Sequence, residues 1–111
     1  MDDLRSGIPD SVKQLLHRSI FSVEQLESLL LLRNSSMNFS GALLAAKLYT
    51  STTGAERTLE YLATQELLKV NEEGLYSYEP VSAELNEVVG QLEKLYKSRR
   101  VSIISTIYNR P

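Results

Sequence analysis

Apolar residues recur at helical spacing along the first two-thirds of the chain. Their pattern predicts four helices, at residues 9–20, 22–33, 40–49 and 53–66. Pro9 suits a first helical turn, while Ser22 and Ser40 are suited to cap the helices that follow them. Polar residues at 34–36 and 50–54 separate these helices, and residues 37–39 form a short extended piece.

The hydrophobic period changes from helical to alternating after residue 66. Leu68 and Val70 alternate with polar residues, and Tyr76 and Tyr78 do so again after a Glu-Glu-Gly turn at 72–74. Glycine can take the positive φ that a tight turn requires. The pattern therefore predicts a β-hairpin.

Helical spacing returns after Ser82, which is suited to cap a last helix. The apolar pattern continues from residue 83 to residue 108, which would give a single helix of about 39 Å. The alternative is a break near Ser98.

From residue 22 onward, the predicted order is helix, short strand, helix, turn, helix, β-hairpin, long helix. Residues 53–78 are the most informative stretch, because a helix ending in Leu67-Leu68 passes directly into the hairpin. Over about residues 20–80 the chain resembles the winged-helix domain of bacterial transcriptional regulators. The resemblance implies a mainly α fold with a small β-hairpin wing, a winged helix-turn-helix plus a long C-terminal helix. Residues 41–49 and 53–66 would form the helix-turn-helix.

The resemblance also implies a division of the chain into two parts. Residues 1–80 would be the winged-helix domain, with a disordered lead at 1–8 and an accessory helix at 9–20. Residues 81–111 would be a C-terminal dimerisation helix, since such regulators often pair two subunits through appended helices.

The same resemblance implies that the protein binds double-stranded DNA in a sequence-specific manner. The start of the second helix of the helix-turn-helix would enter the major groove. Arg57 could then bind guanine, Glu56 or Glu60 could accept a hydrogen bond from cytosine, and hydroxyls could bind phosphate. The implied DNA-binding residues are Ser51, Thr52, Thr53, Glu56, Arg57, Glu60 and Lys69.

Charge favours a second interpretation. The net charge is −2, with −3 over residues 40–80 and +2 over residues 81–111. The tip of the expected wing carries Glu72 and Glu73, and carboxylates oppose binding to phosphates. A winged helix used as a protein–protein interaction module is therefore the alternative. In that case Glu56, Arg57 and Glu60 would form a solvated helix face.

The C-terminal helix carries an apolar stripe that a small domain would not bury completely. We expect part of it to pair with a second copy, so that the protein is a homodimer. The expected interface residues are Leu92, Tyr96, Ile103, Ile104, Ile107 and Tyr108. Packing within one chain is the alternative, and a ligand between this helix and the core is a third possibility.

Catalytic and metal chemistry have little support in the sequence. The chain has no Cys and one His, His17, so we expect neither a transition-metal site nor a cofactor. It has no phosphate-binding glycine loop, and we do not expect an enzyme.

No apolar run approaches the roughly 18 residues that cross a bilayer, and no secretory signal is evident. We therefore expect a cytoplasmic protein without a membrane partner.

Overall fold

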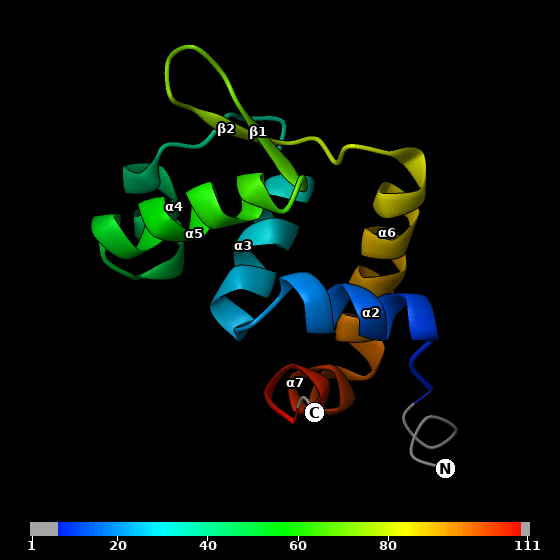
Figure 1. The fold of residues 1–111 in the computed structure, drawn as a ribbon. Helices are drawn as coiled ribbons and strands as arrows, with labels where there is room; N and C mark the ends of the chain where they lie inside the picture. Colours follow the sequence, from blue (N-terminus) through cyan, green and yellow to red (C-terminus); the bar gives the residue numbers. More distant parts are fainter. Residues whose placement is uncertain (1–6, 110–111) are drawn as a thin grey trace. The chain divides into compact units, whose positions relative to one another are not determined.

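The computed structural model describes residues 7–109, which form six helices and two strands (Figure 1). The described chain is mainly helical with a small antiparallel hairpin. Its internal contacts divide it into two units. The central unit is Glu24–Val81, and the terminal unit combines Met1–Val23 with Ser82–Pro111.

Three helices and the hairpin make up most of the central unit. They are α3 (Val23–Arg33), α4 (Gly41–Leu48), α5 (Thr52–Thr64), β1 (Leu68–Val70) and β2 (Tyr76–Tyr78). Helix α4 contacts α5, and α5 contacts β1 (Figure 1). The apolar stripes expected from the sequence are buried, at Leu26, Leu29, Leu32, Leu44, Leu59 and Leu62.

Serine side chains cap two of these helices. Ser40 Oγ accepts a hydrogen bond from Leu43 N at 3.0 Å, and Ser51 Oγ accepts one from Gly54 N at 3.0 Å. The second cap starts α5 at Thr52, one residue earlier than the spacing indicates. The helix ends at Thr64 rather than at Glu66, because Glu66 has a φ of 65°.

The hairpin forms where the alternating pattern predicts it. Leu68 pairs with Tyr78 and Val70 with Tyr76. In the turn, Asn71 Oδ1 accepts hydrogen bonds from two backbone N–H groups, and Gly74 has a φ of 80°. Phe39 N donates to Tyr76 O at 2.7 Å and Tyr76 N donates to Phe39 O at 2.8 Å, so the piece after α3 joins the hairpin.

The terminal unit contains α2 (Asp10–Ser19), α6 (Ala83–Ser98) and α7 (Arg100–Tyr108). Helix α2, which corresponds to the expected accessory helix, contacts both α6 and α7. Pro9 takes the position just before the helix rather than its first turn. Ser82 Oγ caps α6 by accepting a hydrogen bond from Leu85 N at 3.1 Å, as expected.

The C-terminal helix is broken, so the single helix of about 39 Å is wrong and the break near Ser98 is correct. Arg99 has φ −135° and ψ 51°, which is not helical, and it separates α6 from α7. Ser98 Oγ donates to Lys94 O at 3.1 Å, a local bond that competes with regular helix bonding.

Two other expectations concern the ends of the chain and its relation to membranes. Most of the lead expected to be disordered, residues 1–6, lies outside the described residues. Ile8 does not fit that expectation, because its side chain is buried. Within residues 7–109, no helix is both long enough and apolar enough to cross a membrane.

Candidate nucleic-acid interface

The residues expected to contact DNA are all exposed, from the Ser51 cap of α5 along the helix to Glu60 and on β1. The Ser51 cap satisfies Gly54 N, and the N–H groups of Thr52 and Thr53 precede the first intrahelical acceptor. The beginning of a helix with exposed hydroxyls and outward N–H groups can bind a phosphate oxygen. This part of α5 therefore has the groups that a phosphate contact requires.

Two carboxylates flank Arg57 on the exposed face of α5. The side chain of Glu56 lies against Gly41 at the start of α4, because a Cβ atom added there would clash with it. Burial raises the pKa of Tyr76, and the nearby Glu60 and Glu56 carboxylates raise it further. The two glutamates therefore face α4 and β2, where they place negative charge beside the hairpin.

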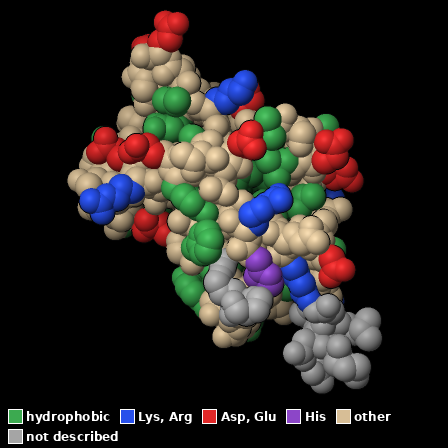
Figure 2. Space-filling model, viewed as in Figure 1, with side chains coloured by type: hydrophobic (Ala, Val, Ile, Leu, Met, Phe, Trp, Pro, Cys, Tyr) green, Lys and Arg blue, Asp and Glu red, His purple; other side chains and the backbone are tan. Residues whose placement is uncertain are grey.

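Lys69 forms an ion pair across the hairpin. Its Nζ lies 2.9 Å from Glu79 Oε2, and both side chains are more than half exposed. The Glu79 carboxylate beside this lysine would oppose its attraction to a phosphate. The hairpin tip adds exposed Glu72 and Glu73, and Figure 2 shows carboxylates at that tip. The expected wing is therefore acidic.

Charge is unevenly distributed in the central unit. Residues 24–81 hold eight Glu and four Lys or Arg, which gives a net charge of −4. No acidic residue lies between Glu27 and Glu56, a stretch that includes Arg33 and Lys47. Arg33 Nη1 donates to the Tyr78 hydroxyl at 3.2 Å, whereas Lys47 is exposed at the end of α4. The connection between α4 and α5 is thus the part of this unit best suited to face phosphates.

Tyr49 is a candidate contact residue that the sequence analysis missed. It follows α4 with φ 57° and ψ 44°, a left-handed conformation, and 96 % of its surface is exposed. Burial does not explain an aromatic ring on left-handed backbone at this position, so we treat Tyr49 as a candidate contact residue. Glycine is the usual residue at a left-handed position after a helix, but nothing in the sequence marks residue 49 as left-handed, so only the structure identifies it.

The expected dimer interface is largely unavailable to a second subunit. Leu92, Tyr96, Ile103 and Ile107 are buried in the single chain, which corrects their placement on a surface stripe. Their helical period reflects the burial of α6 and α7 within the chain. Ile104 is half-buried, and Tyr108 is 58 % exposed and accepts a hydrogen bond from Val23 N at 3.2 Å.

Exposed groups nevertheless remain on α7 and at its junction with α6. Val101 is 78 % exposed near the start of α7, and Tyr108 is exposed at its last residue. The cations at the junction, Lys94, Lys97, Arg99 and Arg100, are exposed too. The Arg100 guanidinium lies 4.5 Å from the centre of the Tyr96 ring.

Among the described residues, no group of three His, Cys, Asp or Glu side chains is arranged to hold a metal ion. The candidate interface consists of hydroxyls, backbone N–H groups, the Tyr49 ring and three exposed cations, Lys47, Arg57 and the paired Lys69. No model of a known protein family, no curated protein and no solved structure matches this chain.

Proposed function

We propose that residues 24–81 form a winged helix-turn-helix domain. The supporting observation is the antiparallel bridge between Phe39 and Tyr76. It adds the segment between α3 and α4 to the free side of β2, so the order along the chain is helix, strand, helix, helix, strand, turn, strand. Helices α4 and α5 then form the helix-turn-helix, and the hairpin forms the wing.

The protein would act as a small transcriptional regulator that binds double-stranded DNA. Helix α5 would lie in the major groove with Arg57 on a guanine, since its guanidinium can donate two hydrogen bonds to that base. Lys47, Tyr49 and the hydroxyls of Thr52 and Thr53 would bind phosphates and fix the position of the helix. This proposal depends on the exposure of these residues at the start of α5.

A second function, a protein-interaction module, has its own support. The central unit carries a net charge of −4, its wing tip is acidic, and Lys69 is paired with Glu79. Each carboxylate near the DNA backbone reduces the gain from counterion release. The same carboxylates would instead attract a protein partner that has a basic surface.

Fluorescence anisotropy with random-sequence duplex DNA separates the two functions. The DNA-binding proposal expects binding at low salt that weakens steeply as salt rises, because phosphate contacts release counterions. Absence of binding at low salt contradicts this proposal and favours the protein partner.

The role of Arg57 is tested on a duplex selected from that pool. We expect Arg57→Ala to weaken specific binding by about 1–3 kcal/mol. Arg18→Ala is the matched control, because it removes the same charge from an exposed position on α2. Equal losses in the two variants would exclude Arg57 from base recognition.

A further inference from the structure

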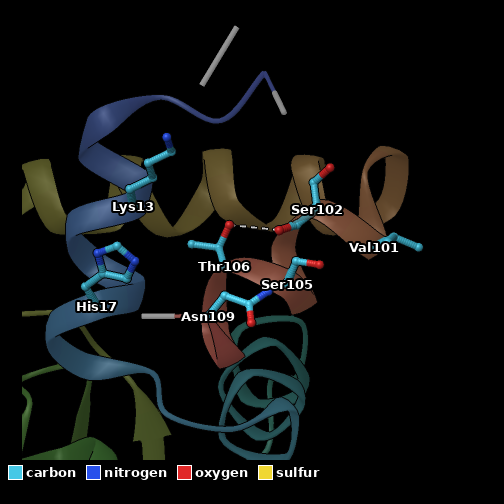
Figure 3. A pocket seen from close by; sticks show the side chains of 7 residues that line it. All are labelled: Lys13, His17, Val101, Ser102, Ser105, Thr106 and Asn109. Carbon is cyan, nitrogen blue, oxygen red and sulfur yellow. Dashed lines mark hydrogen bonds between the residues drawn. The ribbon is translucent and has the colours of Figure 1, made fainter. Parts of the chain in front are cut away.

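A cleft of about 380 Å³ opens in the terminal unit, between α2 and α7 (Figure 3). Helix α2 contributes Lys13 and His17, which are four residues apart and so project from the same side of the helix. Helix α7 and its end contribute the remaining lining residues, Val101, Ser102, Ser105, Thr106 and Asn109. The volume is within the usual range for small-molecule sites.

The lining is rich in hydrogen-bond donors. Lys13 brings an ammonium group, His17 a ring N–H, and Ser102, Ser105 and Asn109 bring hydroxyls and a side-chain amide. Thr106 Oγ1 donates to Ser102 O at 2.8 Å, so its hydroxyl proton is already used within α7 (Figure 3). None of the described lining residues is an Asp or a Glu.

The terminal unit that contains the cleft carries a net positive charge, which is the sign that attracts an anion. The described residues of the terminal unit include six Lys or Arg and four Asp or Glu, a net charge of +2. Asp10 lies one turn before Lys13 on α2 and is exposed to solvent, so it opposes an anion only weakly. The terminal unit thus differs in sign from the central unit.

We propose that this cleft binds a small oxyanion, a phosphate or carboxylate group of a metabolite-sized ligand. Lys13 supplies the positive charge, since a Lys ammonium serves as a point charge for phosphate and carboxylate oxygens. His17 and the hydroxyls of Ser102 and Ser105 supply the directional hydrogen bonds. The bound group bridges α2 and α7. The proposal is independent of DNA binding, because the central unit contributes no residue to the cleft.

Nuclear magnetic resonance titration of the whole chain tests the site. The probes are inorganic phosphate and succinate, each compared with potassium chloride at equal ionic strength. We expect saturable shifts of backbone amide signals in α2 and α7 with at least one probe, and none with chloride. Saturation by phosphate alone would assign the ligand to phosphate compounds, and saturation by succinate alone would assign it to carboxylates. No saturable shift at millimolar concentrations of either probe overturns the proposal.

Matched variants separate a site from general charge attraction. Lys13→Gln should weaken binding of the effective probe about tenfold, because it removes a charge-assisted hydrogen bond. Arg18→Gln removes the same charge from an exposed position on α2 that does not line the cleft, and it should change affinity less than twofold. Equal losses in the two variants would overturn the proposal.

Ser105→Ala gives a second, uncharged test at an exposed position of α7. It should weaken binding several-fold through the loss of one donor. Circular dichroism of each variant shows whether the fold is kept. If Lys13→Gln does not fold, the Ser105→Ala comparison decides, and unchanged affinity in that variant counts against the proposal.

Discussion

Lys69 and Glu79 face each other across the hairpin with 2.9 Å between Nζ and Oε2. The pair joins the only Lys or Arg of the hairpin to a carboxylate. A wing that contacts DNA binds phosphates through its Lys and Arg side chains, and here Lys69 is already paired with Glu79. The ion pair therefore determines how much the hairpin can contribute to the proposed DNA contact.

Glu79→Gln should strengthen DNA binding, because it releases Lys69 and removes one negative charge from the hairpin. We expect the slope of log affinity against log salt to steepen by about one unit, as for one added phosphate contact. The stability change should stay within about 1 kcal/mol, since exposed ion pairs contribute little. Anisotropy titrations over a series of salt concentrations measure the slope.

The control for this prediction is Glu66→Gln, which removes an exposed carboxylate beyond the far end of α5. It should leave the salt slope nearly unchanged. If both variants strengthen binding equally, net charge alone acts and Lys69 has no specific role at the DNA.

Tyr49→Gly should separate stability from binding. Glycine adopts the left-handed conformation of residue 49 without steric cost, so the free energy of unfolding should rise by up to about 1 kcal/mol. DNA affinity should fall several-fold, because the exposed ring and its hydroxyl are lost. Urea unfolding and anisotropy measure the two effects on the same protein.

Tyr49→Phe then divides the binding loss between the ring and the hydroxyl. A loss as large as that of the glycine variant would assign the contact to the hydroxyl, as expected for a phosphate. A glycine variant that binds DNA as tightly as the parent would remove Tyr49 from the interface.

Much of this fold follows from local sequence signals. The serine caps of α4 and α6 and the register of the hairpin each depend on residues close in sequence, so the pattern predicts them. The break at Arg99 is harder to place, because the apolar spacing of Leu92, Tyr96 and Ile103 continues across it. Periodicity shows which residues are buried and says little about where a helix bends.

The candidate site could be predicted only in part. Exposure of Thr53 and Arg57 follows from their place opposite the apolar stripe of α5, whereas Thr52 is exposed because it is the first residue of the helix. The Lys69–Glu79 ion pair depends on the strand register, and the left-handed backbone of Tyr49 depends on how α4 ends. The same stripe that suggested a dimer is buried within one chain, because hydrophobic periodicity does not distinguish intramolecular from intermolecular burial.

Dimer formation through α7 can be tested at Val101, which is exposed in the single chain. We expect the parent to be dimeric at micromolar concentration and Val101→Glu to shift it to monomer, since a charge would be buried at the interface. Val81→Glu, at another exposed apolar position, should keep the parent's oligomeric state. Sedimentation velocity measures all three proteins. A monomeric parent at micromolar concentration contradicts the dimer proposal.

Ionisation of the Tyr76 phenol should lower the free energy of unfolding at alkaline pH. Its pKa is raised above 10.0, first by burial and then by Glu60 and Glu56. As pH rises above about 10, the unfolded chain loses this proton before the folded chain does, so the free energy of unfolding falls. Below that pH, both states keep the proton and the contribution is fully present. Urea unfolding at about pH 9 and about pH 11 should show a smaller fall for Tyr76→Phe than for the parent.

The neighbouring carboxylate gives an independent check on this assignment. Glu60→Gln removes a negative charge near the phenol, so the pKa of Tyr76 should decrease and its absorbance change should occur at lower pH. Glu66→Gln, which removes a carboxylate that does not affect Tyr76, should leave that titration unchanged. A titration curve that is identical in the parent and Glu60→Gln would show that the α5 carboxylates do not face the hairpin, which would also weaken the argument that they oppose DNA there.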